Sequence, residues 1–256
     1  MSKPVIVVTG ASKGIGLAVT KILLQNLNST VVAISRTSTP ELEQLACDSL
    51  LALKCDVSDE DGLSHAISRA INEKGHIDGL ILNAGTLDPL GRIESQDNNL
   101  DSWKAHFDVN FFSLISAVKA SLLQLRKSNY GGRIVFVSSG AAVGGTEGWG
   151  PYNAAKAAMN SLCRTLAEEE PSIVSVAVRP GKVDTSMQAT IRSLGGSTMK
   201  DADHKGFIKA HTDGKLVKTE DVGYCIAELA LRAPKSLSGQ FVSWDSADCA
   251  DYRRKD

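Results

Sequence analysis

The sequence near the N-terminus reads Val5-Ile6-Val7-Val8-Thr9-Gly10-Ala11-Ser12-Lys13-Gly14-Ile15-Gly16. Its first four residues are an uninterrupted β-branched run, which is typical of a strand covered on both faces in a parallel sheet. Apolar residues at helical spacing follow the glycines, namely Leu17, Ala18, Ile22 and Leu23. The segment therefore predicts a strand, a glycine-rich loop and a helix in direct succession.

This order of elements favours a phosphate site in the loop. Small residues let the backbone approach a pyrophosphate closely, and the N-terminus of the next helix offers free N–H groups and a positive dipole end. The spacing G-x-x-x-G-x-G differs from the general dinucleotide fingerprint, so a plain tight turn before a helix is the alternative interpretation. The loop residues expected to contact a dinucleotide are Gly10, Ser12, Lys13, Gly14, Ile15 and Gly16.

The composition suits one globular domain over residues 1–256. The chain is 43% hydrophobic with a formal net charge of -1, and no linker, charge block or repeat divides it. Nothing in this balance favours nucleic acid or an anionic membrane as a partner, and no apolar run approaches the ~20 residues of a membrane span. Five cysteines without C-x-x-C spacing, and a start without a signal-peptide pattern, favour reduced thiols in the cytoplasm.

Further apolar runs predict a doubly wound α/β (Rossmann) fold with a mostly parallel, seven-stranded sheet and helices on both faces. The expected later strands are Val31–Ile34, Leu50–Cys55, Ile77–Leu82, Arg133–Val137, Ile173–Val178 and Gln240–Trp244. The expected helices include Pro40–Ala46, Glu60–Lys74, Asp101–Leu125 and Glu220–Arg232. Residues from about 186 to 218 have poor periodicity and many Gly, Ser and Thr, which predicts a substrate-binding loop or lid.

The end of the second strand is where this fold meets the adenosine ribose. An acidic residue there would bind a ribose 2′-hydroxyl, but this chain has Ser35 followed by Arg36. A guanidinium binds phosphate through two parallel hydrogen bonds, and Lys13 could add a second positive charge. The pattern predicts NADP(H) rather than NAD, although two solvated surface cations are the alternative.

Polar residues also follow the third and fourth strands. Asp56, with Val57, could accept from an adenine amino group, or Asp56 could cap the next helix, which Ser58 or Asp59 could equally begin. Asn83, Ala84 and Gly85 form a small turn at the ligand-binding edge of the sheet, or simply a turn. Asn110 lies in an apolar helix, where a buried amide needs partners, and a satisfied core asparagine is the simpler interpretation.

Ser139, Tyr152 and Lys156 carry the predicted chemistry. Tyr152 and Lys156 stand four residues apart in an alanine-rich segment, which places both on one face of a helix. A nearby ammonium lowers the pKa of a phenol, so Tyr152 could exchange a proton with a carbonyl or alcohol oxygen. Ser139 follows a strand and could hydrogen-bond the same oxygen. No histidine cluster has metal-ligand spacing, and no G-x-S-x-G elbow supports a hydrolase.

Together these residues resemble the short-chain dehydrogenase/reductase family over nearly the whole chain. The matching positions are Thr9, Gly10, Gly14 and Gly16 for the glycine motif, Asp56, Asn83-Ala84-Gly85, Asn110, Ser139, Tyr152, Lys156, and Pro180, Gly181, Val183 and Thr185 for the segment that cradles the nicotinamide. The thirteen-residue step to Tyr152 assigns the serine role to Ser139 rather than Ser138. Ser35, Arg36 and Lys13 resemble the NADP-preferring members.

The resemblance implies a mechanism. Lys156 binds the nicotinamide ribose and lowers the Tyr152 pKa, Ser139 holds the substrate oxygen, and Asn110 connects Lys156 to a water chain. The sequences around Trp149-Gly150-Pro151-Tyr152 and Phe241–Asp245 look similar to the sepiapterin reductase and benzil reductase branch. The expected function is NADPH-dependent reduction of a small ketone or α-diketone, in a homodimer or homotetramer. The alternatives are an NADP-dependent dehydrogenase of a sugar or steroid alcohol and a non-catalytic NADP-binding sensor.

Overall fold

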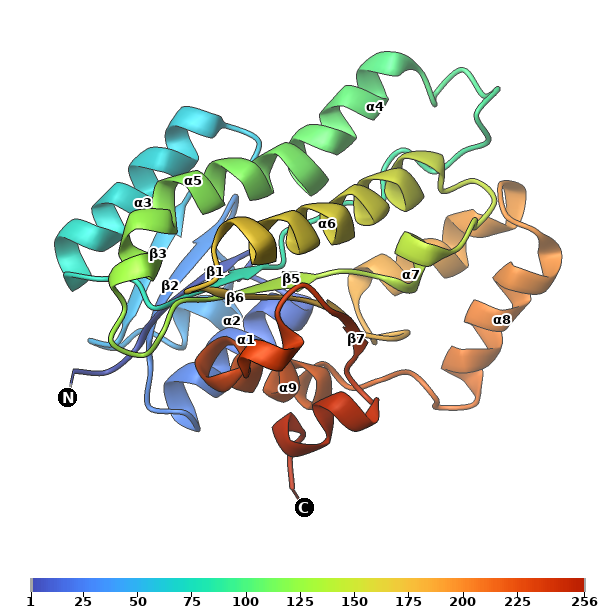
Figure 1. The fold of residues 1–256 in the computed structure, drawn as a ribbon. Helices are drawn as coiled ribbons and strands as arrows, with labels where there is room; N and C mark the ends of the chain where they lie inside the picture. The colour runs from blue at the N-terminus through green and yellow to red at the C-terminus, as the bar shows by residue number, and fades with distance from the viewer. Residues whose placement is uncertain (1, 256) are drawn as a thin grey trace.

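The computed structural model describes residues 2–255 and contains a seven-stranded sheet between two layers of helices (Figure 1). All strand pairs are parallel, in the order β3-β2-β1-β4-β5-β6-β7. The strands are β1 (Val5–Thr9), β2 (Thr30–Ser35), β3 (Leu50–Lys54), β4 (Gly79–Leu82), β5 (Arg133–Val137), β6 (Val174–Arg179) and β7 (Phe241–Ser243). The predicted doubly wound fold is confirmed, and the sheet is wholly rather than mostly parallel.

Helices cover both faces of the sheet. The α-helices are α1 (Gly14–Gln25), α2 (Pro40–Glu43), α3 (Glu60–Lys74), α4 (Leu100–Phe107), α5 (Ser113–Lys127), α6 (Gly150–Glu169), α7 (Ser186–Leu194), α8 (Asp201–Thr212) and α9 (Thr219–Arg232). Helices α3, α5 and α6 pack on one face, and α1 and α9 pack on the other (Figure 1). In the described part of the chain, no helix has both the length and the apolar character that crossing a lipid bilayer requires.

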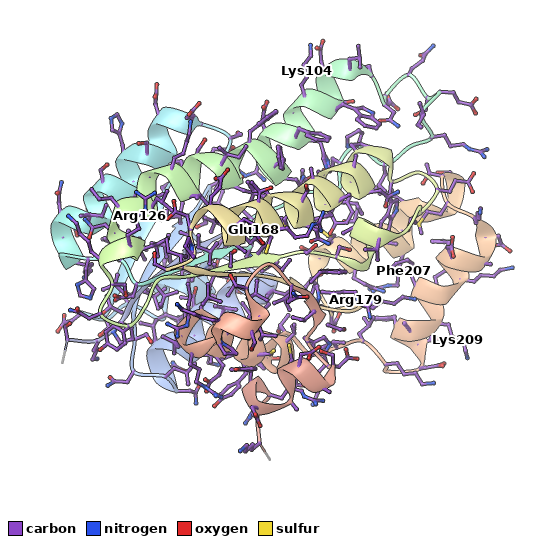
Figure 2. The ribbon with its side chains drawn as sticks, in the orientation of Figure 1. Lys104, Arg126, Glu168, Arg179, Phe207 and Lys209 are labelled. Atoms are coloured by element: carbon purple, nitrogen blue, oxygen red, sulfur yellow. The ribbon has the colours of Figure 1, made fainter. Side chains whose placement is uncertain are left out.

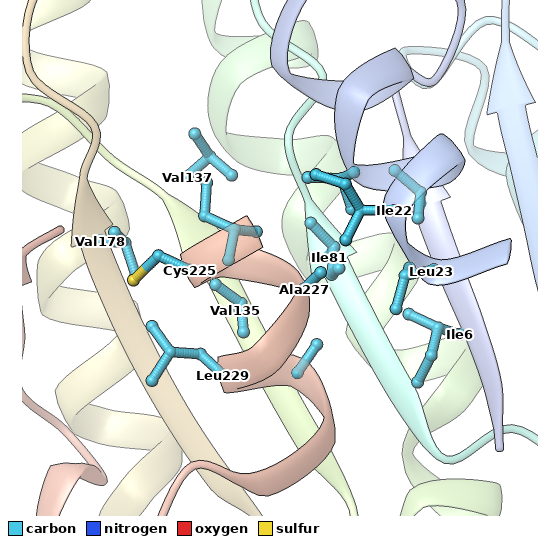
Figure 3. Close-up of a cluster of buried hydrophobic side chains, with 14 of the residues drawn as sticks. Ile6, Ile22, Leu23, Ile81, Val135, Val137, Val178, Cys225, Ala227 and Leu229 are labelled. Carbon is cyan, nitrogen blue, oxygen red and sulfur yellow. The ribbon is translucent and has the colours of Figure 1, made fainter. Parts of the chain in front are cut away.

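The central strands are apolar throughout because neighbouring residues enter different cores. In β1, Ile6 and Val8 pack beneath α1 and α9, whereas Val5 and Val7 pack toward α3 and α5. The same alternation continues in β4 and β5, where Phe136 is fully buried. Figure 3 shows the α1 and α9 side of this arrangement, with Ile22, Leu23, Cys225, Ala227 and Leu229 over Ile6, Ile81, Val135 and Val137.

The strand order fixes where a ligand can bind. The chain builds the sheet in one direction from β1 to β3 and then returns to add β4 on the other side of β1. The connections after β1 and β4 therefore leave the sheet toward opposite faces, which opens a crevice at their carboxyl ends. The glycine loop, Asp56, Asn83-Ala84-Gly85, Ser139 and the segment from Pro180 follow strand ends at this edge.

Two helical predictions were wrong in detail. The expected helix over Asp101–Leu125 is divided into α4 and α5 by a π-helical turn at Asp108–Phe112. The segment over 186–218, expected as a loop, folds into α7, a short 3₁₀ turn and α8. Helix α8 has no buried residue, so it lacks the apolar stripe that makes a helix visible in a sequence.

At the opposite edge of the sheet, one buried carboxylate joins three segments. Asp78 is 3% exposed, accepts from the Val5 backbone N–H at 2.8 Å, and accepts from the Ser128 hydroxyl at 2.6 Å. It thereby links the start of β1, the start of β4 and the end of α5. A buried carboxylate is stable only with such partners.

Asp78→Ala should lower the free energy of unfolding by about 3 kcal/mol, because the buried Val5 N–H and the partly buried Ser128 hydroxyl lose their acceptor. Urea unfolding of wild type and variant measures this. Asp101→Ala is the control, since the Asp101 carboxylate is solvent-exposed and pairs with Lys104 on the surface, and it should change little. A loss for Asp78→Ala below about 1 kcal/mol would contradict a structural role for this carboxylate.

Candidate active site

Ser139, Tyr152 and Lys156 come together where β5 ends and α6 begins. Tyr152 and Lys156 are only 7% and 4% exposed, and the Lys156 Nζ atom lies 5.7 Å from the centre of the Tyr152 ring. Nζ also donates a hydrogen bond to the Val137 carbonyl at 2.8 Å, which ties α6 to the last residue of β5. The Ser139 hydroxyl is near enough to the Tyr152 phenol to lower its pKa. The sequence-predicted trio therefore forms one cluster.

The structure also distinguishes the two adjacent serines. Ser138 is 2% exposed and donates to the Asn160 Oδ1 atom at 2.7 Å, so its hydroxyl is committed within the core. Ser139 is partly exposed, and its oxygen accepts from the Ala141 backbone N–H at 3.2 Å. Because its oxygen accepts this bond, the Ser139 hydroxyl proton can still be donated within the site, in agreement with the thirteen-residue spacing to Tyr152.

The expectation that Lys156 lowers the pKa of Tyr152 below its ordinary value is wrong for this arrangement. Burial raises the pKa of Tyr152, and only the hydrogen bond with Ser139 opposes that shift. Burial also lowers the pKa of Lys156 to about 7, so the amine carries only part of a positive charge near neutral pH. The sequence argument considered the charge of the lysine but not the removal of both groups from water, which is the larger effect here.

Asn110 lies in the π-helical turn and is fully buried. Its Oδ1 atom accepts from the Thr86 N–H at 3.2 Å, and its Nδ2 atom donates to the Thr86 carbonyl at 3.1 Å. A π-helical turn re-aims a side chain by inserting one residue into a helix, and such turns are frequent at functional sites. Asn110 thus holds the segment that follows Asn83-Ala84-Gly85, and its expected connection to Lys156 through water stays a prediction.

His106 is a site residue that the sequence analysis did not identify. It is 1% exposed, and its ring meets the Tyr152 ring edge-on at 6.1 Å between centroids. Its Nδ1 atom lies 2.6 Å from the Asp88 carbonyl oxygen and its Nε2 atom lies 3.1 Å from Asn110 Nδ2. A carbonyl only accepts, so Nδ1 carries the proton and Nε2 accepts from the Asn110 amide. The available signal was the spacing of four residues to Asn110, which places both on one helical face.

Hydrogen bonds from neighbouring segments fix the conformation of the glycine loop. The Asn83 Nδ2 atom donates to the Thr9 and Gly10 carbonyls at 3.0 and 3.2 Å, and the Thr9 hydroxyl accepts from the N–H groups of Asn83 and Ala84. A methyl group at Gly16 would lie 2.2 Å from the Gly10 carbonyl oxygen, so only glycine permits this contact between loop and helix. The Asn83 amide nitrogen therefore stabilises the loop, and the predicted contact of Asn83 with a cofactor stays a prediction.

The N-terminus of α1 is open to an anion. No side chain caps it, and its first turn holds no acidic residue. The free N–H groups and the positive dipole end suit a pyrophosphate. Thr185 faces this loop from the end of β6, because a methyl group at Gly14 would lie 3.3 Å from the Thr185 Cγ2 atom. The residues present thus fit a dinucleotide laid between these segments.

The cations predicted to bind a 2′-phosphate are exposed at the end of β2. The Arg36 side chain is 70% exposed, and its Nη1 atom lies 3.8 Å from the Asp56 Oδ2 atom. Lys13 is also exposed, whereas the Ser35 hydroxyl donates to the Thr37 carbonyl at 3.0 Å. Arg36 is thus held only weakly and can turn toward an anion.

Asp56 had two interpretations, an acceptor for an adenine amino group and the cap of the next helix, and the structure rules out the second. Asp59 caps α3 by accepting from the Gly62 N–H at 3.0 Å, so Asp56 is not the cap. Asp56 instead accepts from the backbone and hydroxyl of Ser58, in the turn before that helix. The Val57 side chain packs in the core beneath α3, so only its backbone can face a ligand.

The other predicted residues also lie at this edge of the sheet. They follow β1, β4 and β6, and they are Ser12, Ile15, Ala84, Gly85, Pro180, Gly181 and Val183. Ile15 packs against the core of α1 and α9, and Val183 pairs with Val217 in a short bridge. In residues 2–255 no three His, Cys, Asp or Glu side chains gather closely enough to hold a metal ion.

Comparison with known proteins identifies the family of the chain. The family model of the short chain dehydrogenases matches residues 4–194. An uncharacterised oxidoreductase of Schizosaccharomyces pombe is 44% identical over 254 residues, covering 96% of this chain and 98% of that protein. An (S)-benzoin-forming benzil reductase of Saccharomyces cerevisiae is 34% identical over 252 residues, covering 94% and 95%. The crystal structure of a Saccharomyces cerevisiae short-chain dehydrogenase/reductase superposes with a TM-score of 0.93 at 33% identity, covering 98% and 100%.

Fold, site and relatives together define an oxidoreductase. The chain belongs to the short-chain dehydrogenase family, and it resembles the benzil reductases within that family.

His106 should make stability depend on pH. Burial holds the pKa of His106 below its ordinary value, the Asp88 carbonyl opposes this shift, and the charge of Lys156 adds to it. As the pH falls below ~6.5, His106 binds a proton in the unfolded chain but stays neutral in the folded chain. The free energy of unfolding therefore falls. In His106→Phe, which keeps a ring in place, the loss of stability between about pH 7.5 and about pH 5 should be smaller than in wild type.

Urea unfolding at both pH values measures this difference. His65→Phe removes an exposed histidine on α3 and controls for the loss of any histidine. An unchanged pH dependence in His106→Phe would show that His106 is not held neutral in the folded protein.

Proposed function

We propose that the protein is an NADPH-dependent carbonyl reductase that acts on a small ketone or α-diketone. The observation that carries this proposal is the buried cluster of Ser139, Tyr152 and Lys156 beside the open N-terminus of α1. The cluster suits proton transfer to a substrate oxygen, and the N-terminus of α1 suits the pyrophosphate of a dinucleotide. The relative that is named a benzil reductase supports an α-diketone as the substrate class.

In this proposal the chain holds the cofactor by its successive strand ends. The glycine loop and α1 bind the pyrophosphate, Arg36 and Lys13 bind the 2′-phosphate, and the segment from Pro180 to Thr185 bounds the nicotinamide. Lys156 donates to the nicotinamide ribose. When bound, NADPH supplies the hydride that reduces the carbonyl carbon.

Tyr152 supplies the proton. Its raised pKa keeps the phenol protonated at neutral pH, which suits an acid that donates to the oxygen of the reduced carbonyl. Ser139 donates a hydrogen bond to the same oxygen and so stabilises the negative charge that develops there. With hydride on carbon and the phenol proton on oxygen, the product is an alcohol.

Lys156 restores the acid after each turnover. An amine with a pKa of about 7 is about half protonated at neutral pH, so it exchanges protons readily in both directions. Its Nζ atom is next to the Tyr152 ring and can return a proton to the tyrosinate. His106 and Asn110 keep the neighbouring wall of the site in position.

Two other functions were considered from the sequence. An alcohol dehydrogenase of a sugar or steroid would use the same residues in reverse, with Tyr152 as the base. A phenol with a raised pKa is protonated at neutral pH, which is the form that a general acid needs and not the form that a general base needs. A non-catalytic NADP-binding sensor would not need Tyr152 and Lys156 buried together, since burying an amine is costly. Reduction is therefore the function that the site supports best.

We also propose a homodimer or homotetramer in the cytoplasm. Phe112, in the π-helical turn that carries Asn110, and Leu123, on α5, are 51% and 58% exposed, which favours a second copy of the chain as cover. All five cysteines are free, and Cys47 is exposed. An exposed free thiol suits a reducing compartment.

Tyr152→Phe should lower the kcat of NADPH oxidation with benzil by about 10²–10⁴-fold, because the variant keeps the ring but loses the acid. The Kd for NADPH, followed by cofactor fluorescence, should stay close to the wild-type value. Wild-type enzyme should oxidise NADPH with benzil and with simple ketones in the same assay.

Tyr130→Phe is the matched control, since the Tyr130 hydroxyl contacts the Ser2 backbone and not the site. Turnover by Tyr152→Phe at the wild-type rate would remove Tyr152 as the acid. Failure of the wild type on every ketone, diketone, quinone and pterin tried would remove the carbonyl reductase proposal itself.

Arg36→Ala should raise the KM for NADPH by about tenfold or more, because a charge-assisted contact to the 2′-phosphate is lost. The KM for NADH should change little, because NADH lacks that phosphate. Steady-state kinetics with both cofactors measure the two effects. Arg69→Ala on α3 is the control, because Arg69 pairs with Glu73 on the surface. Equal effects of Arg36→Ala on the KM values for NADPH and NADH would refute the preference for NADPH.

A further inference from the structure

Trp149 carries a buried hydrogen-bond donor without a partner. The residue is 6% exposed, and its indole Nε1 atom is inaccessible to solvent and makes no hydrogen bond. Burying an unsatisfied donor costs about 1–3 kcal/mol, so native proteins rarely leave one in place. By contrast, the Trp103 indole N–H donates to the Asn98 Oδ1 atom at 2.6 Å. The unpaired N–H of Trp149 therefore points to a partner that arrives with a ligand.

This donor lies beside the proposed acid. The Trp149 ring meets the Tyr152 ring edge-on, with 5.7 Å between centroids and an interplanar angle of 88°. Trp149 also lies 5.6 Å from the ring of Phe207 on α8, which Figure 2 labels. The indole is thus next to both Tyr152 and α8.

The surroundings of the two polar groups are apolar. Trp149 and Tyr152 belong to a hydrophobic cluster that is separate from both cores of the sheet. The cluster also contains Leu87, Ala141, Ile191 and Met199, with Leu90, Met187 and Phe207 packed against it. Such a lining suits a ligand with aryl or alkyl groups and few polar atoms. The Trp149 N–H can then orient such a ligand together with the hydroxyls of Tyr152 and Ser139.

The backbone holds Trp149 in a fixed position. Its N–H donates to the Thr146 carbonyl at 3.2 Å, and its carbonyl accepts from the Asn153 N–H at 2.8 Å in the first turn of α6. The preceding residue, Gly148, has a φ of +79° and would carry a side chain only 2.8 Å from the Thr198 carbonyl oxygen. A donor held this rigidly loses little entropy when a ligand binds to it.

We propose that the Trp149 N–H donates a hydrogen bond to the second oxygen of a vicinal dicarbonyl whose first oxygen receives the Tyr152 proton. This inference deepens the proposed carbonyl reductase function and rests on it for the role of Tyr152. Two adjacent carbonyl groups present two acceptors on neighbouring carbons, which matches two donors on adjoining rings. A simple ketone satisfies only Tyr152 and leaves the indole unpaired. Trp149 thus selects diketones over ketones of the same shape.

The test compares benzil with deoxybenzoin, which keeps both phenyl rings and one carbonyl but replaces the second carbonyl by a methylene. In Trp149→Phe, the ratio of kcat/KM for benzil to that for deoxybenzoin should fall about fivefold relative to wild type, as expected for one neutral hydrogen bond. Trp103→Phe should leave this ratio unchanged, because the indole N–H of Trp103 is already paired within the protein. An unchanged ratio in Trp149→Phe would overturn the proposal.

A binding measurement separates this proposal from the proposed function. The Kd values of both compounds are measured calorimetrically with the NADP⁺-loaded protein, so that no turnover is needed. Preferential binding of benzil that is lost in Trp149→Phe supports the subsite even if the wild type reduces neither compound, in which case only the reductase function fails. Equal binding of the two compounds, or binding of neither, overturns the subsite.

Trp149→Phe also reduces ring size, so thermal unfolding should be checked for both tryptophan variants. If Trp149→Phe does not fold, benzothienylalanine at this position keeps the bicyclic ring and replaces the N–H with sulfur. The same fall in the benzil preference is expected from it, and its absence there refutes the proposal.

Discussion

The buried amine of Lys156 is the constraint on which the site depends. It is 4% exposed and its strongest partner is a backbone carbonyl, Val137 O at 2.8 Å. A fully charged ammonium in such surroundings is costly, so the pKa falls to about 7. The same burial keeps Tyr152 protonated. Removing both groups from water therefore leaves a protonated phenol beside an amine that is only partly charged at neutral pH. The hydrogen bond of the same amine ties α6 to the end of β5.

The arrangement of the strands was predictable because parallel strands buried on both faces are continuous apolar runs. β5 and α3 were placed with the observed bounds, and the other strands differed by one or two residues at their ends. The π-helical turn at Asp108–Phe112 was not predictable, since its side chains are those of an ordinary helix. Helix α8 was missed for a different reason: it buries none of its residues, so its sequence lacks a helical hydrophobic pattern.

Spacing along the chain identified Ser139, Tyr152 and Lys156, because these residues lie on one strand end and one helix. It could not identify contacts made across the fold. His106 touches Tyr152 only because α4 lies against α6, and the second contact of His106 is a backbone carbonyl in the loop after β4. The direction of the Tyr152 pKa shift was also beyond the sequence, because it depends on how completely the surrounding elements exclude water.

The position of α9 has a consequence for synthesis of the protein. This helix packs against α1 and covers the inner strands of the sheet, yet it spans Thr219–Arg232 near the end of the chain (Figure 3). Strands β1 to β6 are complete by Arg179, so a growing chain carries an apolar sheet face before its cover has left the ribosome. Exposed sheet of this kind promotes aggregation. The nascent polypeptide should therefore need chaperone protection late in translation, and C-terminal truncations that remove α9 should leave it insoluble.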